Sequence, residues 1–225
     1  MTRTLATWSE TLPAATVAEM HAALERNAEQ LTELFKQITE ARRIQAGACA
    51  LRLMPVELGA LAREVVADLA PVTAPRRVDV VAPHPVVAHV DEQRVRQILA
   101  NLLSNTARFT PATTTVSISV RRVDDTVEIV CRDDGPGIPQ DRQAALFSMF
   151  ERLGSSSPGL GLGLFVSRGL ARAHLGELYL DADAETGCRF VLRLPLFTPM
   201  VRSGGASTGR SQPADSPEAT DLAQR

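Results

Sequence analysis

Three groups of residues in this 225-residue sequence have types and spacings suited to binding a phosphorylated ligand. The first is the amide pair Asn101 and Asn105, which lie four positions apart and therefore project from one side of a helix. The second is Asp133, within the run Asp-Asp-Gly-Pro-Gly, and the third is the run 159–164, Gly-Leu-Gly-Leu-Gly-Leu. Each group taken alone also fits a plain structural role: an amphipathic helix, a tight turn or a helix cap.

Taken together, the three groups indicate a site for an adenine nucleotide with Mg²⁺. An amide oxygen is a neutral hard ligand that suits Mg²⁺, and a nearby guanidinium such as Arg108 suits phosphate. A carboxylate at the end of a strand can accept a hydrogen bond from adenine N6, and glycines beside it let the backbone approach a flat ring. A glycine-rich loop at a helix N-terminus presents free N–H groups to phosphate. The sequence has no Gly-Lys-Ser or Gly-Lys-Thr, which excludes a P-loop, and no acidic residue at the place a dinucleotide-binding fold requires.

These groups need a framework, and the hydrophobic pattern predicts one of alternating helices and strands. The amide pair lies on an amphipathic helix, 91–109, whose apolar face is Val95, Ile98, Leu99, Leu102 and Leu103. Asp133 follows the second strand of a predicted hairpin, and the glycine-rich run opens a further helix. The other predicted elements are helices at 14–46, 57–70 and within 140–150, and strands at 78–81, 86–90, 116–121, 127–131, 178–180 and 189–194. Pro71 is expected to stop the helix at 57–70.

The long helix at 14–46 carries a heptad stripe. Val17, Leu24, Leu31 and Ile38 recur every seven residues, and other seam positions are filled in register. A stripe of this length needs an apolar partner of similar length, so we expect a homodimer formed through residues 14–46. An ordinary amphipathic helix packed on a globular domain is the alternative.

Composition limits the remaining function classes. The net charge is −2, so nothing global favours nucleic acid or an anionic membrane surface. The three cysteines form neither a disulfide framework nor a metal-binding pattern, and Lys36 is the single lysine. No apolar run reaches the roughly 20 residues of a membrane span, and the N-terminus is too polar for a signal peptide. We therefore expect a cytoplasmic chain that by itself contacts no membrane, although a full-length parent could be membrane-anchored.

At these positions the sequence resembles the catalytic half of a bacterial sensor histidine kinase. The similarity covers the N box at 91–111, the G1 box at 133–138, the F box at 146–152 and the G2 box at 159–164. The resemblance implies an α+β fold: a two-layer α/β sandwich with a mixed sheet, of the Bergerat ATP-binding type, preceded by a helical dimerisation segment. It divides the chain into a partial dimerisation hairpin at 1–50, an ATP-binding catalytic domain at 51–200 and a disordered tail at 201–225.

The resemblance also implies a role for each matching residue. It makes Asn105 the Mg²⁺ ligand, sets Asn101, Arg108 and Arg152 beside the phosphates, and packs Phe109 on the nucleotide. It makes Asp133 the acceptor for adenine N6. The residues that shape the adenine pocket are Gly135, Gly137 and Ile138, and those that hinge a lid and cradle phosphate are Gly159, Gly161, Gly163 and Leu164.

The implied function is transfer of the ATP γ-phosphoryl group to a histidine, for relay to a response regulator. ATPases of the same fold resemble one another in a glutamate where this sequence has Asn101, and neutral imidazole needs less help from a base than water or serine does. The family's phosphoacceptor histidine has no match here; the segment 1–12 resembles the end of a truncated first helix. The alternative is therefore a kinase-like, ATP-binding dimeric adaptor that does not autophosphorylate.

Overall fold

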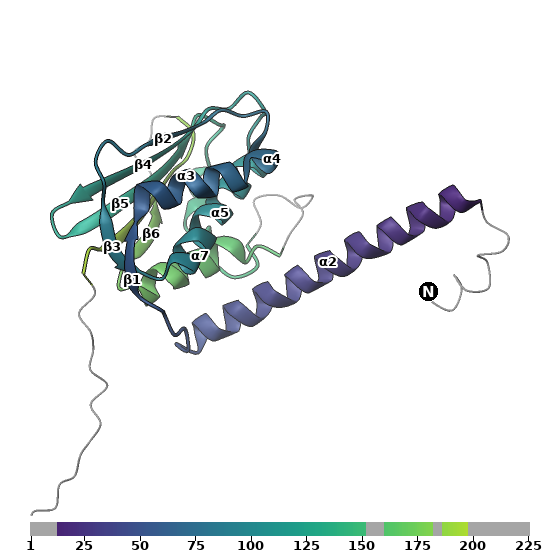
Figure 1. The fold of residues 1–225 in the computed structure, drawn as a ribbon, viewed down its shortest axis with the longest axis horizontal. Coiled ribbons are helices and arrows are strands. Elements are labelled where there is room, and N and C mark those ends of the chain that lie inside the picture. The colour runs from purple at the N-terminus through teal and green to yellow at the C-terminus, as the bar shows by residue number, and fades with distance from the viewer. Residues whose placement is uncertain (1–12, 152–159, 182–185, 198–225) are drawn as a thin grey trace, which may run out of the picture.

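The computed structural model describes residues 13–151, 160–181 and 186–197, in which helices cover one face of a five-stranded sheet (Figure 1). The helices are α2 (Ala14–Gln45), α3 (Leu58–Asp68), α4 (Ala70–Thr73), α5 (Glu92–Phe109), α6 (Gln140–Gln143) and α7 (Gly163–Ala173). The strands are β1 (Met54–Glu57), β2 (Val78–Val81), β3 (Val87–Val90), β4 (Val116–Val123), β5 (Thr126–Asp133), β6 (Glu177–Leu180) and β7 (Arg189–Pro195). The predicted helical turns at 1–12 and the predicted tail beyond 197 lie outside the described residues.

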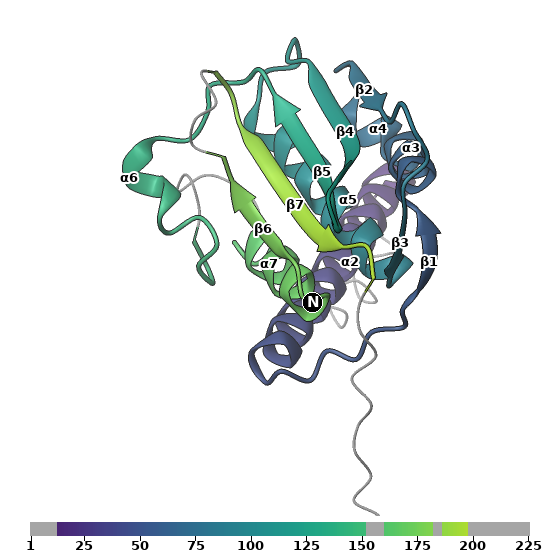
Figure 2. The same cartoon turned by 90° about the vertical axis from the view of Figure 1, so that its left-hand side faces the viewer.

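The main sheet has the strand order β2-β4-β5-β7-β6. β2 runs parallel to β4, and every other neighbouring pair is antiparallel, so the predicted mixed sheet is confirmed. The predicted hairpin is β4-β5, which pairs from Val116 opposite Asp133 to Val123 opposite Thr126. β1 and β3 form a separate two-stranded antiparallel sheet. Figure 2 shows α5 and α7 lying behind the strands, which makes the expected two layers.

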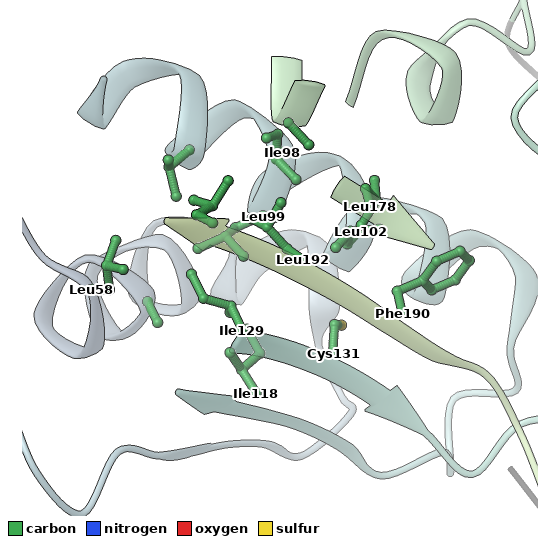
Figure 3. Packing of buried hydrophobic residues seen from close by; sticks show 14 of the residues in the cluster. Leu58, Ile98, Leu99, Leu102, Ile118, Ile129, Cys131, Leu178, Phe190 and Leu192 are labelled. Atoms are coloured by element: carbon green, nitrogen blue, oxygen red, sulfur yellow. The ribbon is translucent and has the colours of Figure 1, made fainter. Parts of the chain in front are cut away.

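The core lies between the sheet and the helices (Figure 3). The apolar face predicted for α5 is buried along its length and meets side chains of β4, β5 and β7. The most enclosed side chains there include Ile98 and Leu99 of α5, Ile118 and Ile129 of the hairpin, and Leu192 of β7. Helix 91–109 and the hairpin are thus held rigidly against each other, and both carry predicted site residues.

Several predicted boundaries differ from the structure by one to a few residues, and the difference at Pro71 has a clear physical cause. The helix expected at 57–70 ends at Asp68, and Pro71 lies inside the short helix α4 instead of stopping the chain's helical path. Proline is tolerated in the first turn of a helix because its missing N–H has no intrahelical acceptor there. The start of α3 is fixed by the last residue of β1: Glu57 caps α3 by accepting hydrogen bonds from the N–H groups of Gly59 and Ala60.

Helix α2 matches the predicted helix at 14–46 and extends away from the sheet for most of its 32 residues (Figure 1). It meets the rest of the chain near its C-terminal end, where Ala41 is buried and a Glu40 carboxylate oxygen lies 2.9 Å from Arg94 Nη1. Leu31 and Phe35 farther along α2 are 66% and 73% exposed. Within the described chain, this apolar stretch is left open to solvent.

The C-terminal end of α7 is tied to the start of α5 by a buried histidine. His174 accepts a hydrogen bond at Nε2 from the Asp91 N–H (3.0 Å), and its Nδ1 lies 2.8 Å from the Leu170 carbonyl oxygen. Burial lowers the pKa of His174, so the ring is neutral and donates from Nδ1. His174 therefore has a structural role, joining α7 to α5. Over the described ranges, none of the helices has the length and apolar character needed to cross a bilayer.

Candidate functional site

A cavity of about 820 Å³ opens between α2, α5 and the start of α7. It brings together seven of the residues predicted from the sequence: Asn101, Asn105, Arg108, Phe109, Gly161, Gly163 and Leu164. Three more cations line it, Lys36 and Arg43 from α2 and Arg94 from α5, with the carboxylates of Glu40 and Glu151. A cavity with this excess of cations and amides suits a polyanion such as a triphosphate.

A second, smaller and more apolar cavity of about 60 Å³ adjoins the first. It contains Asp133, Gly137 and Ile138, and it shares Asn105 and Phe109 with the large cavity. The remaining lining residues are Thr106, Thr110, Pro136, Leu146, Leu164, Cys188 and Phe190. An apolar pocket with one carboxylate suits an adenine base, and the adjoining polar cavity suits the phosphates.

Local signals at both ends of α5 fix where the two asparagines lie. Asp91 caps the helix by accepting a hydrogen bond from the Arg94 N–H at 3.2 Å, and it also accepts one from the Arg52 N–H at 2.9 Å. The helix ends at Phe109, the last residue predicted for it, and Pro111 two residues later disfavours a helical conformation at the residue before it. Four-residue spacing then sets Asn101 and Asn105 on the side of α5 that lines the cavity.

Asp133 stands at the end of β5, as the sequence predicts, and is 4% exposed. Its Oδ1 accepts hydrogen bonds from two backbone N–H groups, Gly135 at 3.0 Å and Cys188 at 3.2 Å. Burial raises the pKa of Asp133, and these two bonds offset the shift only in part. Gly135 lines neither cavity; its part is to orient the carboxylate.

Residues around Asp133 that sequence reasoning did not assign to the site are Thr106 and the two thiols. The Thr106 hydroxyl hydrogen-bonds Asp133, which lowers the pKa of the carboxyl group against the effect of burial. Burial raises the pKa of both Cys131 and Cys188 to about 12, so both thiols are protonated at neutral pH. Neither cysteine is therefore a nucleophile, and Cys188 serves as a wall of the smaller cavity.

The glycine-rich run enters α7 through a turn that only glycine fits. Gly161 has φ +68°, and a Cβ there would collide with the Glu151 carbonyl oxygen. Phe147 of the preceding segment packs edge-on against Phe190, with ring centroids 6.4 Å apart, and the Arg168 guanidinium lies 4.9 Å from its ring. Two predicted residues, Arg152 and Gly159, lie outside the described residues.

Two further parts of the cavity were not predicted as site residues. One is the wall contributed by α2, for which the heptad pattern predicts dimerisation, with packing on a globular domain as the alternative. The other is Ser167, a serine that is 1% exposed and accepts a hydrogen bond from Asn101 Nδ2 at 3.0 Å. A small polar residue on the buried face of an amphipathic helix was the available signal, since Ser167 lies between the buried Val166 and Leu170.

Comparison with known proteins finds an ATPase family and a sensory kinase among the matches. Residues 90–198 match the family described as histidine kinase-, DNA gyrase B- and HSP90-like ATPase. The adaptive-response sensory kinase SasA of Synechococcus sp. (strain JA-2-3B'a(2-13)) is 31% identical over 202 residues, covering 84% of this chain and 54% of SasA. The chain thus spans about half the length of that relative.

Solved structures of histidine kinases also resemble the chain. The structure of full-length ShkA in complex with AMPPNP superposes with a TM-score of 0.73 at 27% identity, covering 83% of this chain and 40% of ShkA. The mycobacterial sensor histidine kinase MprB superposes with a TM-score of 0.57 at 26% identity, covering 64% of this chain and 97% of that structure. These likenesses confirm the α+β fold predicted for the chain.

Proposed function

Because the chain belongs, through residues 90–198, to the family of histidine kinase-, DNA gyrase B- and HSP90-like ATPases, we propose that it is the ATP-binding catalytic region of a two-component sensor histidine kinase. In this proposal it transfers the γ-phosphoryl group of ATP to a histidine, for relay to a response regulator. The observation that carries the proposal is the pairing of two adjoining cavities. The carboxylate of Asp133 lies in the apolar one, and the amides of Asn101 and Asn105 line the polar one.

The residues present fit ATP in one orientation. Adenine enters the smaller cavity and donates from N6 to Asp133, with Gly137 and Ile138 as walls and Phe109 at the junction. The phosphates then extend into the larger cavity toward Arg108 and the start of α7. At that start the first backbone N–H groups of the helix have no intrahelical partner, and they favour negative charge.

The donor set also fits Mg²⁺. Asn105 lines both cavities, so it lies where the proposed base and phosphate regions meet, and its side-chain oxygen is available as a ligand there. A bound Mg²⁺ would neutralise phosphate charge during transfer. The protein's own part is to bind and orient: Arg108 offers a guanidinium to the phosphates, and Asn101 lines the same cavity without offering a carboxylate base. Lack of a base at that position favours a neutral imidazole acceptor over water.

The same proposal assigns partners. The exposed stripe on α2 is expected to pair with a second copy of the chain through residues 14–46, giving a homodimer. A response-regulator receiver domain is the expected recipient of the phosphoryl group. Since ATP is the substrate, the catalytic region is expected to face the cytoplasm.

The decisive experiment follows both fates of the γ-phosphate. The chain is incubated with Mg²⁺, [γ-³²P]ATP and a dimerisation hairpin that retains a phosphoacceptor histidine, supplied as a separate polypeptide. We expect acid-labile, alkali-stable label on the hairpin, and we expect Asn105→Ala to abolish it. Release of inorganic phosphate without labelled histidine would refute the kinase proposal and favour a hydrolase. Failure of the chain to bind ATP at all would refute the site assignment.

A further inference from the structure

The side chain of Asn101 is enclosed by two residues of α7. Its Nδ2 donates a hydrogen bond to Ser167 Oγ at 3.0 Å, and Ser167 is 1% exposed. Its Oδ1 lies against Gly163, where an added Cβ would collide with that oxygen. Gly163 and Ser167 are four residues apart on α7, so they present one surface to the Asn101 amide.

This enclosure has a consequence for the cavity, because Asn101 and Ser167 both line it. The terminal torsion of an asparagine is broad and roughly two-fold, so an unrestrained amide samples several orientations. A partly buried hydrogen bond on one side and a close backbone on the other hold the plane of the Asn101 amide against α7. The same two contacts join α5, which carries the amides, to the first turn of α7, which follows the glycine-rich run.

We propose that Ser167 is a positioning residue for phosphoryl transfer, acting through Asn101. It holds the Asn101 amide against Gly163 and so fixes the separation of α5 and the N-terminus of α7, the two walls between which the phosphates lie. The inference rests on the proposed function of the cavity and adds to it a residue that touches neither base nor metal. Gly163 makes this arrangement possible, since a Cβ at position 163 would collide with the Asn101 amide.

Two variants distinguish a positioning role of the Ser167 hydroxyl from a role of the Ser167 side chain in packing alone. Ser167→Ala removes the hydroxyl and leaves nearly the same volume, whereas Ser167→Thr retains a hydroxyl. Ser119→Ala, which removes a half-buried hydroxyl from β4 away from both cavities, is the matched control. Loss of one neutral buried hydrogen bond is expected to change a rate by about three- to tenfold.

The measurements use the full chain with the histidine-bearing hairpin as acceptor. In Ser167→Ala we expect the transfer rate to fall by about three- to tenfold while ADP affinity stays within about twofold of the wild-type value. We expect Ser167→Thr to restore the rate and Ser119→Ala to leave it unchanged. A ¹⁵N-labelled sample should show a shifted Asn101 side-chain amide signal in Ser167→Ala and a wild-type signal in Ser167→Thr.

The outcomes are distinct for the two proposals. A wild-type transfer rate in Ser167→Ala, or an unmoved Asn101 amide signal, overturns the positioning role and leaves the kinase function intact. An equal loss of ADP affinity and transfer rate also overturns it, because a general loosening of the fold lowers both. A wild-type chain that binds no nucleotide overturns the proposed function, and the positioning role falls with it.

Discussion

Replacing Asp133 by asparagine should reverse the hydrogen-bonding character of the base pocket without disturbing its shape. Oδ1 of Asp133 accepts from the N–H groups of Gly135 and Cys188, and an asparagine oxygen can accept both. The amide nitrogen then takes the place of the second carboxylate oxygen. There it presents a donor to the donor N6 of adenine, so the variant should lose the contact that we assign to adenine recognition.

The magnitude follows from the environment of the carboxylate. Asp133 is 4% exposed, so water does not replace the lost acceptor. A hydrogen bond to a charged group contributes about 1.5–3 kcal/mol, which corresponds to about ten- to hundredfold in ATP affinity. Guanine carries an acceptor at the position of the adenine amino group, and the new amide can donate to it. Selectivity for ATP over GTP should therefore fall by at least about tenfold in Asp133→Asn.

The assay is calorimetric titration of the full chain with ATP and with GTP, in the presence of Mg²⁺. Asp134→Asn is the matched control, since it makes the same change in charge at the next residue, where the side chain is exposed and accepts from the Thr115 N–H at 2.7 Å. We expect the control to bind ATP like the wild type. ATP affinity within about twofold of wild type in Asp133→Asn would show that this carboxylate does not recognise the base.

Stability should move in the opposite direction to affinity. Burial raises the pKa of Asp133 above its ordinary value of 3.8. A carboxyl group whose folded pKa is raised stabilises the fold most at low pH, and this contribution is lost as the pH rises through the folded pKa. The ionised carboxylate is therefore unfavourable for folding at pH 7, and a neutral asparagine removes that cost. The melting temperature of Asp133→Asn at pH 7 should equal or exceed that of the wild type.

Other perturbations test the surrounding structure. Burial lowers the pKa of His174, so its contribution to stability is present above pH 6.5 and is lost as the pH falls below that value. Calorimetry should therefore show a melting temperature that drops between about pH 6.5 and 5. The variant His174→Gln should show a flatter dependence of melting temperature on pH. Glu128→Gln should cost about 1 kcal/mol in urea unfolding, since Glu128 is 4% exposed but its two arginine partners are half-exposed. Gly169→Ala should displace Ile44 and speed hydrogen exchange in the last turn of α2, with ADP affinity unchanged. An acyl phosphate of ATP should acylate Lys36, the single lysine, and excess ATP should block the label seen by mass spectrometry.

The elements that the sequence predicted well are those with a strong local period. Helix 91–109 shows its apolar face at helical spacing, has an aspartate cap and stops before Pro111, so propensity, pattern and packing agree. The first strand of the hairpin around Asp124 alternates apolar and polar residues, and its second strand is a mostly apolar run that ends at Asp133. The sequence therefore predicted which side chains of these elements line the two cavities, and their roles toward a nucleotide stay predictions.

What escaped prediction depends on contacts between distant segments. Ser167 is 66 positions from Asn101 in the sequence, and no periodicity links a serine on one helix to an amide on another. Docking of α2 on the globular domain was predicted only as the alternative to dimerisation, since its heptad stripe indicates that an apolar partner is needed and not that the last turn packs on α7. The prediction that Pro71 stops the helical path was wrong because proline is tolerated in the first turn of a helix, where α4 places it.

The contacts of α7 indicate which helix separates from the rest of the chain most easily. α7 is bonded to α5 at two places, by Ser167 near the middle of α7 to the Asn101 amide and by His174 at its C-terminal end to the Asp91 N–H; the first bond is partly buried and the second is buried. Separating α7 from α5 breaks the two together, at about 1 kcal/mol each before any apolar surface is exposed. Helix α2 is held near its C-terminal end by the Glu40–Arg94 ion pair and by the packing of Ala41 and Ile44 on the core, while most of its length extends away from the sheet. Partly exposed ion pairs contribute about 0–1 kcal/mol. Motion should therefore occur between α2 and the layer of α5 and α7, while α5 and α7 keep the two walls of the proposed phosphate site at a fixed separation.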